Sequence, residues 1–378
     1  MGSETSSIRR HDRTLVFLAV VAVIASLFAY TAAQPARVFA EGAGPLDHFT
    51  VEFTGTATAG SPITVTVTAR DADETPVEDY PGGAVFDATL GAGCSGTCDA
   101  VYGSLSFVSG IAAADVTPYL AETGVVLSVT DAGIGKTGAT GAFDVGPGVL
   151  TSIEISPEDA SITADDGTQS YTTEGFDAYG NSRGDVTGAT TFDIDGTACS
   201  GSDCGSTTVG DYIVMGTSGG FTDATGLTVT PGALDQFTFD TIATQVAGTP
   251  FGFEVKAWDA YGNIKTDYAG GAVLSGLASS PGCAFCAPSF TGADATYGAI
   301  VWSQGVGTVT GVIATNAQGG AQVTATDGGV SDPSGTFEVT HSAVLGGITI
   351  DTIADQIAGT AFSVTVRAFD EFGNVKLD

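Results

Sequence analysis

The sequence predicts an all-β protein made of tandem two-sheet β-sandwiches that follow an N-terminal signal or anchor helix. Three observations predict this class: apolar and polar residues alternate in short segments, one unit recurs along the chain, and glycine is abundant, with 54 of 378 residues. With 43% hydrophobic residues, the chain has enough apolar side chains to form cores. No Gly-X-Y period runs through it, which excludes a collagen-like protein.

The acidic composition excludes one class of partner. The chain has 43 Asp and Glu residues against 11 Lys and Arg, a formal net charge of −32. A nucleic-acid-binding protein needs clustered Lys and Arg side chains to neutralise phosphates, so we expect no nucleic acid as a partner. Only 14% of the residues are charged. The acidity therefore comes from scarce bases, and the composition favours an extracellular protein.

The N-terminal segment predicts export. Arg9, Arg10 and Arg13 precede an apolar run at residues 15–30, and small residues follow at positions 31–33. This order of basic, apolar and small residues is typical of a secretory signal. We expect residues 1–40 to be a signal peptide, cleaved after residue 33 or residue 40, or an uncleaved signal anchor. The chain is then secreted or displayed on the cell surface, and it touches a membrane only through residues 15–33 if these are uncleaved.

The rest of the chain is a repeat. A shift of 188 residues without a gap places Leu46-Asp-His-Phe-Thr-Val on Leu234-Asp-Gln-Phe-Thr-Phe. A shift of 111 places Asp240-Thr-Ile-Ala on Asp351-Thr-Ile-Ala, and a looser copy begins near Leu150. Repetition at such periods predicts an array of domains. The predicted units are residues 41–149, 150–233 and 234–342 and a partial unit at residues 343–378.

Within each unit the apolar period is two. Apolar side chains alternate with polar ones over residues 63–69, and the same register recurs at residues 251–257 and 362–368. An earlier strand is expected around Phe49 and its counterparts, and later strands at residues 323–326 and 335–339. Such alternation buries one face of a strand, and short strands between turn residues predict a sandwich of about seven strands per unit.

A recurring turn follows the alternating strand of three units. The pattern is Asp-x-(Tyr/Phe)-Gly-Asn, in which Gly and Asn tolerate positive φ and Asp accepts hydrogen bonds from free amides. The structural turn residues are Asp177, Gly180, Asn181, Asp259, Gly262, Asn263, Asp370, Gly373 and Asn374. The first unit has Asp71-Ala-Asp-Glu-Thr-Pro76 instead. Because this segment has no Gly-Asn pair, we expect a different turn there.

These residues carry a resemblance to a known family. The segment Val255-Lys-Ala-Trp-Asp-Ala-Tyr-Gly-Asn263, followed by Gly270-Gly-Ala-Val, resembles bacterial immunoglobulin-like repeats of the invasin/intimin type. The segment Val366-Arg-Ala-Phe-Asp-Glu-Phe-Gly-Asn374 is similar. The resemblance covers most of residues 46–378 and implies immunoglobulin-like sandwiches strung into a surface-exposed rod, which serves as a stalk or adhesin. It implies no catalytic residues.

The cysteines form one close pair in each of the first three units, which predicts local disulfides in an oxidising compartment. The expected pairs are Cys94 with Cys98, Cys199 with Cys204, and Cys283 with Cys286. Loops this short contribute about 2 kcal/mol each by chain entropy. The alternatives are a zinc site and a thioredoxin-like role for the Cys283–Cys286 pair. Against them, paired CxxC knuckles at metal spacing are absent, and the redox motif lacks its helix.

One motif suggests hydrolase chemistry. The residues Gly216-Thr-Ser218-Gly-Gly220 match the G-x-S-x-G nucleophile elbow, which requires a strand, a turn and a helix. Here a second strand is expected after the turn, and the repeat aligns Ser218 with the turn residues Asp327 and Asp131. Beyond the leader, only His48 and His341 are available as bases, both at unit boundaries. We therefore expect no catalytic triad and no enzyme.

Two weaker signals concern ligands. Carboxylates at Asp71, Asp73 and Glu74 are candidates for calcium, although no full calcium-loop signature is present. No other cofactor is expected. The aromatic side chains of Trp258 and Phe369 fall on the solvent side of the alternation, where they could stack on sugar rings or pack at an edge.

The sequence thus predicts a non-enzymatic extracellular repeat protein with stalk-type or adhesin-type modules, whose partner is a surface protein or a glycan. The alternative is a carbohydrate-binding array accessory to a secreted enzyme. The last unit offers only two strands, which cannot close a sandwich. We expect the chain to be a fragment of a longer protein; alternatively, the last strands pair with the open edge of a neighbour.

Overall fold

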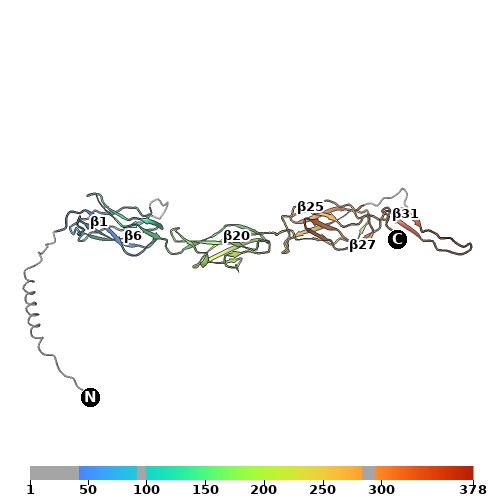
Figure 1. Ribbon diagram of the computed structural model, residues 1–378, viewed down its shortest axis with the longest axis horizontal. Helices are drawn as coiled ribbons and strands as arrows, with labels where there is room; N and C mark the ends of the chain where they lie inside the picture. Colours follow the sequence, from blue (N-terminus) through green and yellow to red (C-terminus); the bar gives the residue numbers. More distant parts are fainter. Residues whose placement is uncertain (1–41, 92–98, 283–293, 378) are drawn as a thin grey trace, which may run out of the picture. The chain divides into compact units, whose positions relative to one another are not determined.

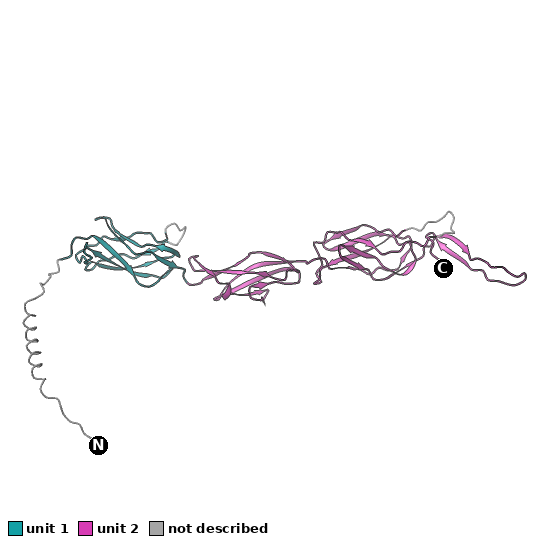
Figure 2. Cartoon of the chain, viewed as in Figure 1, with its two compact units in different colours: residues 1–148 teal, residues 149–378 magenta. Residues whose placement is uncertain are grey.

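The computed structural model describes residues 42–91, 99–282 and 294–377. The predicted signal or anchor at residues 1–40 lies outside these ranges. The chain divides into two compact units, Met1–Gly148 and Val149–Asp378 (Figure 2). In the described ranges every element is a β-strand except one short 3-10 helix, which confirms the all-β class (Figure 1). Across those ranges no helix has the length and apolarity needed to cross a bilayer.

The first unit contains one β-sandwich, called here the first sandwich. One layer is a four-stranded sheet with the order β1-β3-β6-β5, and the other consists of the sheets β2-β10-β7 and β4-β8-β9. The strands are β1 His48–Phe53, β2 Ala57–Thr58, β3 Ile63–Arg70, β4 Val85–Phe86, β5 Val101–Tyr102, β6 Ile111–Thr117, β7 Glu122–Val125, β8 Ser128–Asp131, β9 Lys136–Ala139 and β10 Phe143–Gly146.

The period of two decides which residues form the core of the first sandwich. Along β3, the side chains of Ile63, Val65, Val67 and Ala69 are buried, while the threonines between them point outward. These apolar side chains meet Leu127 and Val129, which come from the opposite layer. The predicted alternation is therefore confirmed, and its physical cause is the removal of one face of the strand from water.

The second unit contains two further sandwiches, and the earlier one is called here the second sandwich. Its sheets have the orders β11-β14-β15, β12-β20-β19-β16-β17 and β13-β18. Its elements are β11 Ser152–Ser156, β12 Ala160–Thr163, β13 Gln169–Ser170, β14 Thr172–Phe176, β15 Ser182–Asp185, η1 Thr187–Ala189, β16 Thr191–Ile194, β17 Thr197–Ala198, β18 Asp203–Cys204, β19 Gly210–Ser218 and β20 Phe221–Thr230.

The third sandwich repeats the topology of the first. Its sheets have the orders β21-β23-β26-β25, β22-β30-β27 and β24-β28-β29. The strands are β21 Gln236–Phe239, β22 Gln245–Val246, β23 Phe251–Trp258, β24 Val273–Ser275, β25 Ile300–Ser303, β26 Val306–Val312, β27 Gln318–Ala321, β28 Thr324–Asp327, β29 Val330–Pro333 and β30 Phe337–Thr340. The late strands expected at residues 323–326 and 335–339 correspond to β28 and β30.

The chain continues into a two-stranded antiparallel sheet, called here the C-terminal hairpin. It consists of β31 Leu345–Ile350 and β32 Val366–Asp370. We expected the alternating strand to begin at Phe362, but residues 361–365 are not in a strand. The pairing of β31 with β32 ends at Ile350 and Val366, so residues 361–365 have no strand ladder beside them in the described chain. Phe362 and Val364 are 51% and 43% exposed.

Candidate functional site

The feature that recurs in the described chain is the turn after β3, β14, β23 and β32. In the third sandwich, Asp259 Oδ1 accepts hydrogen bonds from the backbone N–H groups of Tyr261 (3.0 Å) and Asn263 (2.8 Å). Gly262, between these two residues, has φ +82°, a conformation that glycine adopts without strain. The Asn263 side chain closes the turn by donating from Nδ2 to Asp259 Oδ2 at 2.8 Å.

The second sandwich and the C-terminal hairpin have the same turn. Asp177 Oδ1 accepts from the N–H groups of Tyr179 and Asn181, both at 2.9 Å. Asp370 Oδ1 accepts from the N–H groups of Phe372 (2.9 Å) and Asn374 (2.8 Å). In each case the asparagine donates back to the aspartate, at 2.8 Å for Asn181 and 2.9 Å for Asn374. Gly180 and Gly373 have φ +81° and +84°.

The first sandwich has this turn as well, so our expectation of a different turn was wrong. Asp71 Oδ1 accepts from the N–H groups of Asp73 (3.0 Å) and Thr75 (2.8 Å), and Glu74 takes the left-handed conformation with φ +63°. The expectation failed because it attributed the turn to the Gly-Asn pair. The aspartate caps the free amides by itself, and a non-glycine residue tolerates the left-handed position at a moderate cost.

The aspartates of these turns are buried. Asp259 and Asp370 are 0% exposed, and Asp71 is 5% exposed. Burial raises the pKa of Asp259, but hydrogen bonds from the Asn263 side chain and from three backbone N–H groups outweigh it and hold the pKa below its ordinary value. The N–H groups of Thr75 and Gly44 lower the pKa of Asp71 in the same way. An N–H donor stabilises the charged form of a carboxylate.

The turn of the third sandwich also contacts the second sandwich. Asn263 donates from Nδ2 to the carbonyl oxygen of Thr207 at 2.8 Å, and its Oδ1 accepts from the N–H of Val209 at 3.1 Å. Asp259 Oδ2 accepts from the N–H of Gly232 at 3.0 Å, and Lys265 Nζ donates to the Gly232 carbonyl oxygen at 2.7 Å. Gly232 lies in the linker between the two sandwiches.

The C-terminal hairpin contacts the third sandwich in the same manner. Asn374 donates to the carbonyl oxygen of Thr315 at 2.9 Å and accepts from the N–H of Ala317 at 2.8 Å. Asp370 Oδ2 accepts from the N–H of Ser342 at 2.8 Å, and Lys376 Nζ donates to the Ser342 carbonyl oxygen at 2.9 Å.

Sequence reasoning missed the lysines of these contacts. Lys265 and Lys376 both lie six residues after the turn aspartate, and Arg183 lies six residues after Asp177. Only seven Lys and Arg residues follow Ala40, so three at one repeat position formed a signal that could have been found. A turn interpreted only as a local reversal gives no reason to expect a basic residue beside it.

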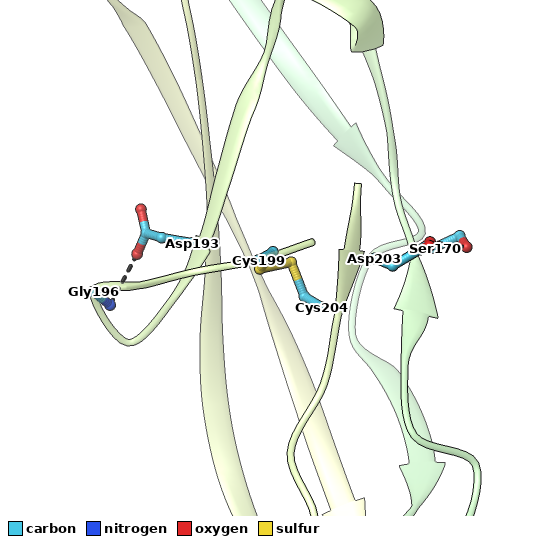
Figure 3. The surroundings of a disulfide bond; sticks show 6 residues. All are labelled: Ser170, Asp193, Gly196, Cys199, Asp203 and Cys204. Atoms are coloured by element: carbon cyan, nitrogen blue, oxygen red, sulfur yellow. Dashed lines mark hydrogen bonds between the residues drawn. A yellow bond between two sulfur atoms is a disulfide. The ribbon is translucent and has the colours of Figure 1, made fainter. Parts of the chain in front are cut away.

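The second sandwich contains a disulfide between Cys199 and Cys204 (Figure 3). The S–S distance is 2.03 Å, and the bond closes the loop between β17 and β18. Ser170 Oγ donates to the Asp203 carboxylate, and Asp193 Oδ1 accepts from the N–H of Gly196 at 2.9 Å. The other predicted pairs, Cys94 with Cys98 and Cys283 with Cys286, are not tested, because each includes residues outside the described ranges.

The calcium candidates are engaged by protein groups. Both oxygens of Asp71 accept backbone N–H groups, with Gly44 donating to Oδ2 at 2.7 Å. The Glu74 carboxylate lies 3.5 Å from His48 Nε2 and 3.8 Å from Arg70 Nε, and Asp73 is exposed. Within the described ranges, no group of three or more His, Cys, Asp or Glu side chains is placed to hold a metal ion.

Ser218 lies in the hairpin between β19 and β20, where Gly219 and Gly220 both have positive φ. Its side chain is 3% exposed and donates to the carbonyl oxygen of Ala189 at 3.3 Å. A strand follows this turn, so the strand-turn-helix geometry of a nucleophile elbow is absent from this part of the described chain.

The candidate glycan-stacking aromatics are only half exposed. Trp258 Nε1 donates to Thr238 Oγ1 at 2.7 Å on the same sheet, and Phe369 is likewise half-buried. Tyr261, in the turn, is 49% exposed.

A second recurring feature is a buried Tyr–Asp pair. The Tyr80 hydroxyl donates to Asp131 Oδ2 at 2.5 Å in the first sandwich, and Tyr268 donates to Asp327 Oδ2 at 2.5 Å in the third. Burial and the neighbouring carboxylate raise the pKa of both tyrosines, so neither loses its proton at neutral pH. The pair ties the segment after the Asp turn to β8 or β28 and is a structural element.

Comparisons with protein-family models and with curated proteins give no match. Solved structures are similar in fold. The adhesin FdeC of Escherichia coli has 21% identity and a TM-score of 0.46, over 79% of this chain and 99% of that chain. Domains 4 and 5 of the S-layer protein SbsC have 20% identity and a TM-score of 0.25, over 51% and 100%. An I-band fragment of titin has 10% identity and a TM-score of 0.29, over 78% and 99%. The similarity concerns the fold alone, and the described chain consists of tandem β-sandwich modules.

Proposed function

We propose that the chain is a non-enzymatic structural and interaction protein of the cell surface or the extracellular medium, of the stalk or adhesin type. The observation that carries this proposal is the Asp turn, which recurs in four successive repeats. At both junctions within the second unit, this turn is hydrogen-bonded to the preceding repeat. A series of modules coupled in this way transmits force and separates whatever lies at its two ends. The invasin/intimin type of the repeat is part of the same proposal.

Two further observations support a mechanical rather than a chemical role. The one serine in a hydrolase-like motif is buried in a hairpin, and the recurrent carboxylates accept backbone N–H groups. Export fits the acidic composition and the signal-like N-terminus. N-terminal sequencing of the chain secreted by a bacterial host tests the export step, because cleavage after residue 33 or 40 leaves a defined new terminus.

Single-molecule stretching of the full chain tests the proposed function. Modules of the lengths predicted here release about 30 nm and about 40 nm of chain as they unfold, at roughly 3.5 Å per residue. We expect these steps to occur one after another in a sawtooth trace. One cooperative event that releases the whole chain at once would contradict a series of modules.

A further inference from the structure

We propose that the Asp, Asn and Lys of the turn form an inter-repeat latch that binds backbone groups of the preceding sandwich and of the linker. The latch residues are Asp259, Asn263 and Lys265 at one junction and Asp370, Asn374 and Lys376 at the next. The asparagine binds a carbonyl oxygen and an N–H that lie two residues apart at the end of the preceding sandwich. The aspartate and the lysine bind the N–H and the carbonyl oxygen of one linker residue. The proposal does not depend on the export or adhesion of the chain.

The two junctions make the same four hydrogen bonds to different residues. The asparagine contacts Thr207 and Val209 at one junction and Thr315 and Ala317 at the other. The linker residue is Gly232 in one case and Ser342 in the other. All eight atoms contacted in these shared bonds belong to the backbone. At the second junction Ser342 Oγ also donates to Glu371 Oε1 at 3.1 Å, and Lys376 Nζ lies 3.4 Å from His341 Nδ1, but these two contacts are not among the four bonds that the junctions share. An asparagine carboxamide suits this task because it carries both a donor and an acceptor, like a peptide group.

The latch residues are largely buried. Asp259 and Asp370 are 0% exposed, and Asn374 is 3% exposed. If the preceding repeat moved away, the linker N–H and the loop groups would lose these partners. A buried polar group without a partner is costly, so the docked arrangement is favoured as long as the latch is intact.

The latch also forms without a completed sandwich around it. In the C-terminal hairpin, Ile348 and Val366 are each 58% exposed, whereas their counterparts Phe237 and Val255 in the third sandwich are 3% and 0% exposed. The latch at Asp370, Asn374 and Lys376 nevertheless makes all its bonds. It therefore requires only the turn, its two strands and the preceding sandwich.

The first sandwich has the turn without the asparagine and lysine of the latch. In the first sandwich, Thr75 and Val77 occupy the positions of Asn263 and Lys265, and the turn around Asp71 is unchanged. Asp71 Oδ2 also accepts a hydrogen bond from the N–H of Gly44, which occupies the position of the linker residue Gly232. The aspartate is thus sufficient for the turn, and the asparagine and lysine are needed for the contact with another repeat.

The test uses the full chain with Asn263→Thr, which copies the first sandwich and preserves the turn. Amide hydrogen exchange is measured residue by residue. We expect the N–H of Val209 to exchange at least about tenfold faster, because it loses its acceptor, while the N–H groups of Tyr261 and Asn263 stay within about twofold. Lys265→Val, added to this change, should release the second and third sandwiches to tumble with different rotational correlation times in ¹⁵N relaxation.

Two matched variants complete the design. Tyr261→Ser alters an exposed residue of the same turn and should leave Val209 protected. Val209→Ala copies Ala317 of the other junction and should keep protection at position 209, since only its N–H is recognised. Unchanged exchange at Val209 in Asn263→Thr would overturn the latch. Equal loss of protection at Val209, Tyr261 and Asn263 would show that the asparagine serves the turn alone, and would also overturn it.

Discussion

The turns of the first and third sandwiches have the same backbone hydrogen bonds and different sequences. Asp71-Ala-Asp-Glu-Thr and Asp259-Ala-Tyr-Gly-Asn place N–H groups two and four residues after the aspartate on the same carboxylate oxygen. Thr75 is exposed at the end of one turn, whereas Asn263 is half-buried and contacts another sandwich at the end of the other. The comparison separates two tasks that a single motif combines: the aspartate forms the turn, and the asparagine extends its contacts beyond it.

The largest effect is expected from removing the aspartate. Asp259→Ala leaves three backbone N–H groups and the Asn263 amide without their acceptor, which should lower the unfolding free energy of the third sandwich by about 3 kcal/mol. Asp71→Ala removes three N–H partners and should cost the first sandwich about 2 kcal/mol.

The two sandwiches can be monitored separately. Both tryptophans of the chain, Trp258 and Trp302, lie in the third sandwich, so their fluorescence in urea reports on that sandwich. Hydrogen exchange in β3 reports on the first. The exposed Asp235 provides a control, since Asp235→Ala should change the fluorescence midpoint little. If Asp259→Ala behaved like this control, the aspartate would not form the turn.

Acid should weaken both turns by the same route. The pKa values of Asp71 and Asp259 are lowered in the folded state, so the unfolded chain binds more protons than the folded chain at acid pH. Their contribution is complete well above pH 3.8, the ordinary value of an aspartate, and is lost as the pH falls through 3.8 towards the lower folded-state pKa. The urea midpoint of tryptophan fluorescence should fall over this range. In Asp259→Asn the fall should be shallower, and an equally steep fall would show that other carboxylates dominate.

The buried Tyr–Asp pairs should respond alike in the two sandwiches. Tyr80→Phe and Tyr268→Phe each remove a hydroxyl that donates to a carboxylate at 2.5 Å. A loss of about 1.5 kcal/mol is expected in each case, since a hydrogen bond to a charged group is stronger than a neutral one. Hydrogen exchange in β3 measures the loss of stability for Tyr80→Phe, and tryptophan fluorescence in urea measures it for Tyr268→Phe. Unequal losses would mean that the first and third sandwiches differ in more than the turn.

The smallest effect concerns the left-handed residue of the turn. Glu74 has φ +63° where Gly262 has φ +82°. Gly262→Ala should destabilise the third sandwich by about 1 kcal/mol, because a side chain is strained in this conformation. Glu74→Gly should stabilise the first sandwich by less than about 1 kcal/mol, because relief of strain is partly offset by the greater freedom of glycine in the unfolded chain. A stabilisation of the third sandwich by Gly262→Ala would contradict the assigned conformation.

Much of the fold could be predicted because its signals are local. The alternation along β3 and β23 follows from residue types at a spacing of two, and the covered face follows from that spacing. The Asp turn and the short cystine loop at Cys199 and Cys204 also span only a few residues. The repeat added long-range information, because two segments with the same pattern must bury the same positions.

The sequence alone determined the all-β class, the repeat and the aspartate of the turn. The class and the turn depend on residues that are close together in the chain, and the repeat is seen directly when distant segments of the sequence are compared. The tertiary structure decided the rest. Asn263 accepts a hydrogen bond from Val209, which is 54 residues away in the sequence, and Tyr80 donates one to Asp131, which is 51 residues away. Such contacts depend on strand register and on the contacts between successive modules. Neither can be predicted from the residues next to the contact in the sequence. For the same reason, the first turn proved equivalent to the others only when its backbone hydrogen bonds were seen.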